Sequence, residues 1–277
     1  MIRIITDSTS DISRERAEEL GIDIVPLGVI FGEETFLDGV TISAKEFYDK
    51  LQTVTKLPKT SQVTPYQFET LFRKYIDQGD EIIGIFISHK MSGTYQSAVI
   101  ASDICPERIH IIDSMNVTVC LGLLVEEAVK LKNKELTAQE IVEKIENIKD
   151  KLRLFAVVDT LKYLQMGGRI SSTSALVGNL LDINPIIGIY DGFVESVAKT
   201  RGKKAAYRWI EKKVQEEVIN NEYPVRFANS NSPELMKDFI NFISEKIQIT
   251  ESTIAEIGPV VGTHAGPGAV CIAYFTK

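Results

Sequence analysis

The sequence contains no long hydrophobic run and little cysteine. No stretch approaches the about 18 uncharged apolar residues of a membrane span, and no apolar run leads from Met1 to a small-residue cleavage site. The three cysteines, Cys105, Cys120 and Cys271, are far apart, odd in number and set among apolar residues. This pattern is typical of buried free thiols in a reducing compartment. We therefore expect a cytoplasmic protein with no integral membrane segment.

The chain also lacks an excess of positive charge. Its formal net charge is −7 over 277 residues, with acidic and basic residues mixed along the chain, which argues against nucleic acid as a partner. Hydrophobic residues make up 44% of the chain and charged residues 25%, as in folded globular proteins rather than disordered ones. A chain of this length can bury one large core or two moderate cores, and its size favours two domains.

Several sequence motifs of enzymes are absent as well. The chain has no Walker sequence, no Gly-x-Gly-x-x-Gly after the first apolar run, no His-Glu-x-x-His and no Gly-x-Ser-x-Gly. Nucleotide binding, zinc hydrolysis and serine-esterase chemistry therefore lose their usual support. The three cysteines and three histidines also lack the spacing of metal ligands. We assign no catalytic residue, no metal site and no cofactor.

Short apolar runs alternate with helical patterns through the first half of the chain. These runs cover residues 2–6, 24–29, 82–87 and 109–113. They predict buried strands of a mostly parallel sheet. The helices between them begin with capping boxes, in which a Ser or Thr precedes a Glu or Gln by one helical turn; these boxes start at Ser43, Thr64 and Thr137.

The pattern changes from about residue 154 onward. Further strands are predicted at 155–159, 185–190, 193–200, 225–228, 252–257 and 270–275. Asp191-Gly192 lies between two of them and is a strong hairpin signal, and hairpins belong to mixed or antiparallel sheets. Helices predicted at 205–220 and 232–246 would cover one face of this second sheet.

These patterns predict an α/β protein of two domains. The first, residues 1–152, is an N-terminal and mostly parallel α/β sandwich. The second, residues 153–277, is a C-terminal α/β domain with a mixed or antiparallel sheet. We place the boundary near residue 152, because the predicted strands after it belong to a mixed or antiparallel sheet rather than to the parallel one.

Segment 92–98 has the pattern of an anion-binding turn. Ser92 and Gly93 follow the predicted strand 82–87, and small and medium residues from Thr94 onward favour a helix. The free N–H groups at the start of such a helix point back at Ser92, where a phosphate or carboxylate can bind. Capping of the helix by Ser92 explains the same residues, so both interpretations stay open for this segment alone.

Two further segments place polar groups beside turns. Thr60, Ser61 and Gln62 come just before a predicted helix start, although Ser and Thr are also ordinary turn residues. Segment 262–268 holds three glycines and a proline around His264. Glycine permits a positive φ or close backbone approach, and a His beside it can donate a hydrogen bond to an anion. A glycine-rich turn with an exposed His is the alternative.

Segments 6–11 and 159–170 carry charged groups that have both a structural and a functional interpretation. Asp7 and Asp11 follow the first predicted strand, where α/β folds place ligand groups. Their carboxylates can orient neighbouring loops or act as bases, but helix capping is the simpler explanation, and we assign no catalysis to them. A Gly-Gly pair ends a predicted short helix just before Arg169, which can pair with a carboxylate or meet a phosphate or a partner.

Taken together, these motifs resemble the DegV family. The resemblance rests on residues 6–8, 60–62, 92–98, 164–170 and 262–268, which match in order and spacing. It extends over essentially the whole chain, and five motifs in register are far more specific than any one of them. The resemblance implies a two-domain α/β protein that binds one long-chain fatty acid, such as palmitate, and is a carrier rather than an enzyme.

The resemblance also implies a site and a partner. The acyl chain would lie buried between the domains, and a separate ATP-dependent kinase subunit would phosphorylate its carboxylate, as with the fatty-acid-binding subunit of bacterial fatty acid kinase. The product would be an acyl phosphate for phospholipid synthesis. The positions that match the family's carboxylate-binding motifs are Thr60, Ser61, Ser92, Gly93, Thr94 and His264.

One departure from the family pattern affects this assignment. Val63 and Thr64 stand between the Thr-Ser-Gln motif and Pro65, where the family usually has the proline directly. The two additional residues can shift the loop, so the sequence leaves open whether Thr60 or Ser61 is the main carboxylate contact.

Two arginines are candidates for the surface that meets the kinase, Arg169 and Arg201, because an acidic protein can use local positive charge for docking. Two other functions remain open from the sequence. The chain can be a lipid sensor or storage protein without a kinase. It can also be a small-molecule phosphotransferase or hydrolase with Ser92 as nucleophile and His264 as base, although no activating third residue is evident.

Overall fold

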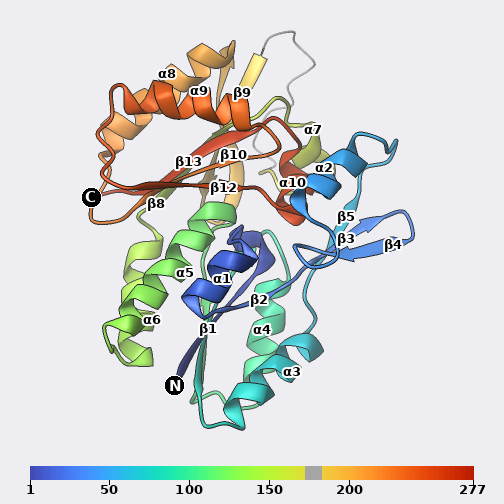
Figure 1. The fold of residues 1–277 in the computed structure, drawn as a ribbon, viewed down its shortest axis with the longest axis vertical. Helices are drawn as coiled ribbons and strands as arrows, with labels where there is room; N and C mark the ends of the chain where they lie inside the picture. The colour runs from blue at the N-terminus through green and yellow to red at the C-terminus, as the bar shows by residue number, and fades with distance from the viewer. Residues whose placement is uncertain (172–182) are drawn as a thin grey trace.

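The computed structural model describes residues 1–171 and 183–277. They form two large sheets, each packed against helices, and one small sheet (Figure 1). The first sheet has the order β2-β1-β6-β7 and is parallel throughout. Its strands are β1 (Ile2–Asp7), β2 (Asp23–Val25), β6 (Glu81–Phe86) and β7 (Ile109–Asp113). The helices of this half are α1 (Arg14–Leu20), α3 (Pro65–Ile76), α4 (Thr94–Ser102), α5 (Thr118–Asn133) and α6 (Ala138–Lys149). The predicted parallel sheet is confirmed.

Three helix starts follow from their capping boxes. In α2 (Ala44–Leu51), α3 and α6, the side chain of Ser43, Thr64 or Thr137 accepts a hydrogen bond from the N3 backbone, and the N3 side chain accepts one from the N-cap backbone. Each box satisfies two N–H groups that the first helical turn leaves without partners. The three predicted helix starts are therefore confirmed.

The run 24–29 does not form a single strand, and this prediction is wrong. Residues 23–25 belong to β2 of the parallel sheet, whereas β3 (Gly28–Phe31) pairs with β4 (Glu34–Leu37) and β5 (Lys59–Ser61) in an antiparallel sheet of its own. Pro26 lies between the two strands and has no N–H to continue the ladder. The chain leaves the first sheet at that residue.

The second large sheet is mixed, as predicted. Its order is β10-β9-β8-β13-β11-β12, and only β11 and β12 are parallel. Its strands are β8 (Leu152–Val157), β9 (Ile183–Tyr190), β10 (Phe193–Arg201), β11 (Val225–Asn229), β12 (Ser252–Glu256) and β13 (Val270–Phe275). Asp191 and Gly192 form the hairpin turn between β9 and β10 with φ of 46° and 76°, the positive values of a type I′ turn.

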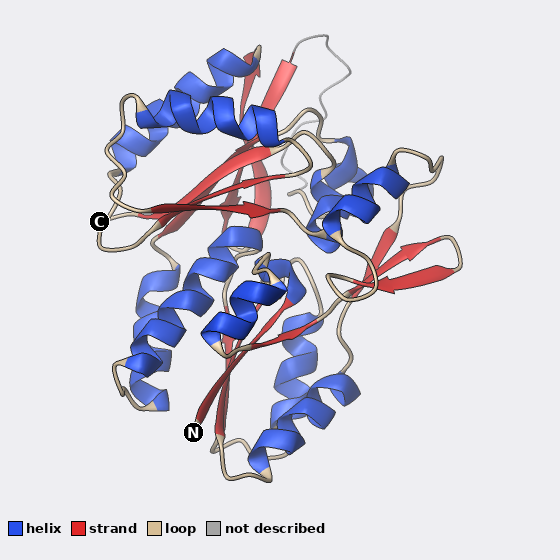
Figure 2. Cartoon of the chain, in the orientation of Figure 1, coloured by secondary structure: helices blue, strands red, loops and turns tan. Residues whose placement is uncertain are grey.

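Helices cover this sheet on its outer side (Figure 2). They are α8 (Lys203–Glu217) and α9 (Pro233–Ser244), which bury Tyr207, Ile210 and Phe239 with the aromatic residues of β8 and β11. Two short helices, α7 (Lys162–Gly167) and α10 (Pro259–Ala265), pack against each other at the end of the sheet that lies beside α2. None of the helices in the described part of the chain combines the length and hydrophobicity that a bilayer crossing requires.

Helix α5 lies between the two large sheets. Eleven of its sixteen residues are buried, and one hydrophobic cluster joins them to Ile4 and Ile83 of the first sheet and to Cys271 and Ala273 of the second. A helix that is apolar nearly all round must be covered on every side, which places α5 in the centre of the molecule. The two domains therefore share a core. The position of their boundary near residue 152, where β8 begins, remains a prediction.

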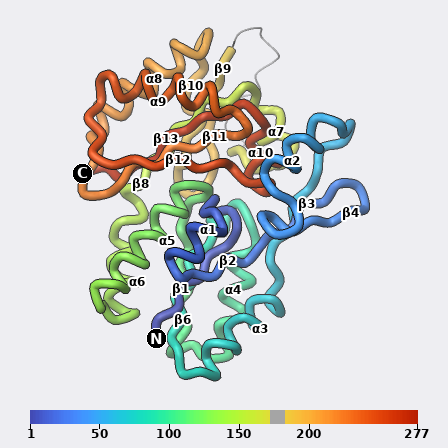
Figure 3. The backbone as a smooth tube through the Cα atoms, viewed as in Figure 1, coloured from blue at the N-terminus to red at the C-terminus, as the bar shows by residue number. Residues whose placement is uncertain are grey.

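Segments distant in sequence also meet at the edge of the molecule. Helix α10, near the C-terminus, packs against α2, β3 and β5 of the N-terminal half, and Figure 3 shows its red tube beside their blue ones. Val260 of α10 is buried in the same cluster as Phe47 and Val29. The C-terminal part of the chain therefore completes the wall formed by α2 and the small sheet.

An ion pair ties α5 to the second sheet. Arg226 of β11 donates from Nη2 to Glu126 of α5 at 2.7 Å, and its side chain is only 7% exposed. Glu126 also accepts from the Nε of Arg16 at 3.1 Å. Burial opposes ionisation of Glu126, but these two guanidinium groups outweigh it and lower the pKa of the carboxyl group.

We expect Glu126→Gln to lower the free energy of unfolding by about 3 kcal/mol, because Arg226 is left as a buried charge without its counter-ion. Denaturant unfolding of both proteins measures the difference. Glu19→Gln is the matched control, since Glu19 pairs with the same Arg16 but is 65% exposed. The control should change stability by less than about 1 kcal/mol. Equal losses in the two variants would contradict a central role for the buried pair.

Candidate ligand-binding site

A cavity of about 370 Å³ is lined by residues from both halves of the chain. Its volume lies in the range of small-molecule sites, about 300–1,000 Å³. Most of the wall is apolar and comes from β8, β9, β10 and β13, with the start of α5 and part of α10. The apolar residues of the sheet that line it are Leu154, Ala156, Ile187, Ile189, Val194 and Cys271. An elongated apolar group fits such a wall.

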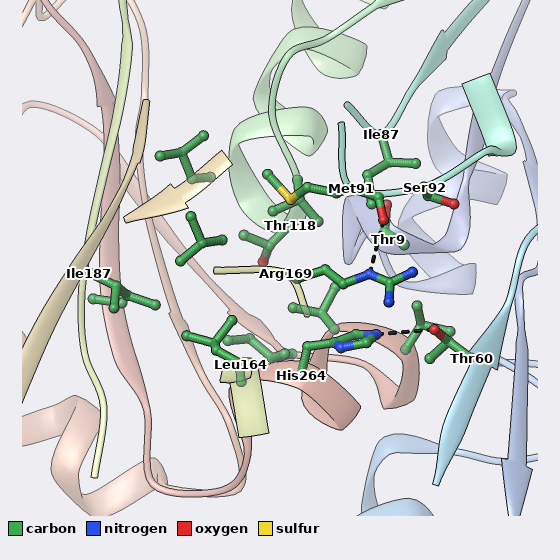
Figure 4. A pocket seen from close by; sticks show the side chains of 18 of the residues that line it. Thr9, Thr60, Ile87, Met91, Ser92, Thr118, Leu164, Arg169, Ile187 and His264 are labelled. Atoms are coloured by element: carbon green, nitrogen blue, oxygen red, sulfur yellow. Dashed lines mark hydrogen bonds between the residues drawn. The ribbon is translucent and has the colours of Figure 1, made fainter. Parts of the chain in front are cut away.

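Polar side chains gather at one end of the cavity (Figure 4). Thr60 on β5 and His264 on α10 lie together, with 3.0 Å between Thr60 Oγ1 and His264 Nε2. Arg169 lies beside them; its Nε donates to the carbonyl of Met91 at 3.1 Å and its Nη1 to the carbonyl of Gly167 at 2.6 Å. The cavity is therefore apolar along the sheet and polar at the end that meets β5 and α4.

Thr60 and Ser61 have different surroundings, although both line the cavity. Neighbouring residues of a strand point to opposite faces, so only one of them can face His264, and this residue is Thr60. Ser61 pairs with Gly28 of β3, where a Cβ atom would lie 2.3 Å from Ser61 Oγ. The Ser61 hydroxyl therefore packs over the glycine of the neighbouring strand.

Segment 92–98 begins α4, with Gly93 as N-cap. Ser92 Oγ accepts from the N–H of Thr94 at 3.2 Å and lies 2.9 Å from the Thr94 hydroxyl, so it contacts the first residue of the helix. Ser92 and Gly93 line the cavity. Thr94 is buried and is not among the lining residues; its hydroxyl accepts from the N–H of Val63 at 3.4 Å. Thr94 supports the turn from behind.

Gln62 lines the cavity and was not among the predicted site residues. Its Nε2 donates to the Ser97 hydroxyl at 2.9 Å and to the Gly93 carbonyl at 3.3 Å, joining β5 to α4. A Cβ atom at position 93 would lie 2.1 Å from Gln62 Oε1, so glycine is needed there for close approach. The sequence signal for Gln62 was its place beside Thr60 and Ser61 in one polar motif.

His264 is an uncharged ring at neutral pH. Burial lowers its pKa to about 4, and the positive charge of Arg169 acts in the same direction. Its Nδ1 is buried and has no hydrogen-bond partner among the described residues. A proton on Nδ1 would therefore be a buried donor without an acceptor, which is rare in proteins, so we assign the proton to Nε2. Nε2–H then donates to Thr60, and the Thr60 hydroxyl can donate into the cavity.

Close approach of α7 holds the His264 ring in place. A Cβ atom at Gly167 would lie 2.1 Å from His264 Nδ1, whereas one at Gly168 would meet nothing within 4 Å. Gly168 has φ of 67° and caps α7. The predicted C-cap therefore explains Gly168 alone, and Gly167 leaves space for His264.

The two arginines predicted to meet a kinase occupy different places. Arg169 lines the cavity, where both of its bonded nitrogens face backbone carbonyls. Arg201 is the last residue of β10, is exposed, and is not among the residues that line the cavity. The structure therefore brings Arg169, but not Arg201, to the other predicted site residues.

The arrangement suits an anion with a long apolar tail. A guanidinium group and two hydroxyls at one end of an apolar cavity can donate hydrogen bonds to a carboxylate. Over residues 1–171 and 183–277, no three His, Cys, Asp or Glu side chains come together as metal ligands would. We find no hydrogen bond between Ser92 and His264 in this part of the chain; Ser92 is bonded to Thr94.

Comparison with known proteins agrees with this geometry. A family model described as "Uncharacterised protein, DegV family" matches residues 1–277. The chain is 35% identical to a DegV domain-containing protein of Caldanaerobacter subterraneus, over 100% of this chain and 99% of that protein. The chain belongs to the DegV family, as its motifs predicted.

Two solved structures have the same fold over their whole length. One is described as showing fatty acid binding of a DegV family protein from Thermus thermophilus; it has a TM-score of 0.91 and 27% identity, and covers 100% of this chain and 99% of its own. The other is a stearic-acid-binding protein from Eubacterium ventriosum, with a TM-score of 0.88, 28% identity and the same coverage. The predicted two-domain α/β class is confirmed.

We expect the His264 ring to titrate near pH 4, and Gly167→Ala to raise this pKa toward the about 6.5 of a hydrated histidine, because the added methyl group displaces the ring from its buried place. NMR titration of the His264 imidazole signals in the two proteins measures this change in pKa.

Gly168→Ala is the control for this substitution. The positive φ at position 168 strains an alanine, but the added methyl group would touch no atom. The pKa of His264 should therefore stay as in the wild type. A wild-type midpoint near 6.5, or equal shifts in both variants, would show that contact with Gly167 does not determine the state of the ring.

Proposed function

We propose that this protein binds one long-chain fatty acid, with the carboxylate at the polar end of the cavity and the acyl chain along the second sheet. The observation that carries the proposal is a cavity that joins an apolar wall to a cluster of donors formed by Thr60, Ser92 and Arg169, with His264 bonded to Thr60. Fatty acids have this division of polarity. The fatty-acid-binding descriptions of two structurally similar proteins support the same ligand class.

The acyl chain would supply most of the affinity. A chain of about fifteen methylenes at about 0.8 kcal/mol each has a gross limit near 12 kcal/mol, from which the cost of association is subtracted. Two or three hydrogen bonds to the carboxylate, at about 1.5–3 kcal/mol each, mainly offset its loss of hydration. The polar end therefore fixes where the carboxylate lies, and the apolar wall retains the ligand.

The polar end is suited to holding a carboxylate rather than to cleaving a bond. Arg169 supplies a positive charge, and Thr60 can donate its hydroxyl because His264 donates to its oxygen. A nucleophilic Ser92 needs a base within hydrogen-bond reach, but its neighbour is Thr94, and His264 is bonded to Thr60. We infer a carrier without a chemical step of its own.

The bound carboxylate would be the substrate of a separate ATP-dependent kinase subunit. One carboxylate oxygen would attack the γ-phosphorus of ATP, releasing ADP and giving an acyl phosphate for phospholipid synthesis. The family resemblance supports this role, and the cytoplasm, favoured by the free cysteines, is where it would take place. Storage or sensing of the fatty acid without a kinase is the alternative.

Mass spectrometry of lipid extracted from the purified, denatured protein tests the ligand directly. We expect one fatty acid per chain. Protein that contains none and binds no added palmitate would overturn the proposal. Protein that binds palmitate but supports no acyl-phosphate formation with any fatty acid kinase subunit would favour storage or sensing.

Thr60→Ala and Ser92→Ala should each weaken palmitate binding by about tenfold, because each removes one hydrogen bond to a charged group. Ser61→Ala is the matched control; its hydroxyl lies over Gly28, so binding should stay within about twofold of the wild type. Isothermal titration of delipidated protein measures the three affinities. Wild-type affinity in Ser92→Ala, or a loss in Ser61→Ala as large as in Thr60→Ala, would refute the assignment.

Of the two arginines, we propose that Arg169 serves the carboxylate and that Arg201 lies in the surface that meets the kinase. Arg201→Glu should leave palmitate affinity unchanged and raise the kinase concentration needed for half-maximal rate by about tenfold, with a smaller effect at high salt.

Arg73→Glu is the matched control, because it makes the same change of charge on α3, where Arg73 is 58% exposed. It should leave the kinase concentration needed for half-maximal rate nearly unchanged. The docking role is wrong if Arg201→Glu loses palmitate binding, or if both arginine variants weaken the kinase equally.

A further inference from the structure

The first turn of α10 is held by two carboxyl groups from the N-terminal half. Asp11 Oδ1 accepts from the N–H of Gly258 at 2.9 Å, and Asp38 Oδ2 accepts from the N–H of Val260 at 3.3 Å. Pro259, between them, has no N–H. A Cβ atom at Gly258 would lie 3.1 Å from Asp11 Oδ1 and 3.2 Å from Asp38 Oδ1, so both carboxyl groups converge on this glycine.

Other bonds connect the same groups to the surrounding structure. Tyr48 of α2 donates to the carbonyl of Ile257, one residue before the turn, at 3.1 Å. Asp11 accepts on its other oxygen from the hydroxyl of Thr118, a residue that lines the cavity at the start of α5. The start of α10 and the residue before it are therefore hydrogen-bonded to Asp11, which is the C-cap of η1 (Ser8–Ser10), to Asp38, and to Tyr48 of α2.

Helix α10 transmits this position to the ligand end of the cavity. It has seven residues, and at about 1.5 Å per residue it extends for only about 10 Å, so it moves as one rigid body. His264 lies in the last turn of α10 and must stay within hydrogen-bond distance of Thr60, which lies on β5 of the small sheet. A shift at Gly258 would carry the ring away from Thr60.

We propose that Asp11 and Asp38 are positioning residues for recognition of the carboxylate: through the first turn of α10 they hold His264 against Thr60. This inference rests on the proposed function for its ligand. The sequence left the use of Asp11, in the acidic motif after β1, undecided. The proposal gives this residue a role in orienting the site.

The positioning depends on hydrogen bonds rather than on negative charge. The pKa of Asp11 is raised to about 8 and that of Asp38 to about 7, mainly by loss of hydration; the charges of Asp38 and Asp7 contribute at Asp11, and the charge of Asp7 contributes at Asp38. The bonds from Thr118 and Gly258 oppose the shift at Asp11, and the bonds from Ser8 and Val260 oppose it at Asp38. An uncharged amide oxygen accepts the same N–H groups, so asparagine should substitute for either residue.

The test compares palmitate with hexadecanol, which has the same chain and no carboxylate. Asp38→Ala should weaken palmitate binding by about tenfold but hexadecanol binding by less than about threefold, whereas Asp38→Asn should bind both as the wild type does. Asp11→Gly and Asp11→Asn form the second pair, since glycine accepts the φ of 50° at Asp11 without strain. Thermal unfolding of each variant shows that it is folded.

A double-mutant cycle separates positioning from general loosening. If Asp38 acts through His264, Asp38→Ala combined with His264→Ala should bind palmitate no more than about twofold more weakly than His264→Ala alone. In the ligand-free protein, the imidazole NMR signals of His264 should move in Asp38→Ala and return to their wild-type positions in Asp38→Asn.

The outcomes are distinct. Additive losses in the cycle, equal losses for palmitate and hexadecanol, or an asparagine variant as impaired as alanine would overturn the positioning role. Failure of the wild type to bind palmitate would instead overturn the proposed function, and the NMR comparison would still test whether Asp38 holds His264.

Discussion

Insertion of α10 against the N-terminal half is the contact on which the site depends. Thr60 and His264 are 204 positions apart in the chain, and they meet because α10 packs on α2 and the small sheet. The apolar side of the contact is Val260 in the cluster around Phe47. Its polar side is the pair of N–H groups at the start of α10, of Gly258 and Val260, which donate to Asp11 and Asp38. Hydrophobic burial brings the segment in, and the hydrogen bonds define its position.

The cavity exists because the wall of the second sheet is buried but not filled. Ala156, Ala269 and Cys271 are small residues on strands or turns next to larger neighbours, and protein cores normally leave few voids of this size. Gly188 lines the cavity with its backbone alone, because a Cβ atom there would point to the other face of β9 and lie 2.9 Å from the Tyr190 ring. An acyl chain would replace the missing side-chain atoms, so ligand affinity and the packing of the protein are coupled.

Much of the fold could be predicted from local patterns. Capping boxes fixed three helix starts because they depend on residues within one turn, and Asp191-Gly192 fixed the hairpin because few residues adopt its positive φ values. The small antiparallel sheet could not be predicted. β5 has no hydrophobic residue, and β3 continues the apolar run of β2, so only Pro26 marks the division between two sheets.

The sequence by itself determined most strands of the two large sheets, the mixed character of the second sheet and the polar motifs of the site, because each depends on neighbouring residues and on a pattern of motifs along the chain. The tertiary structure decided which of these motifs meet. It placed Thr60 rather than Ser61 beside His264, put Arg169 in the cavity wall, and showed that Gly167 makes room for the ring. These are contacts between segments distant in the chain, and their distances follow from packing, which no local pattern specifies.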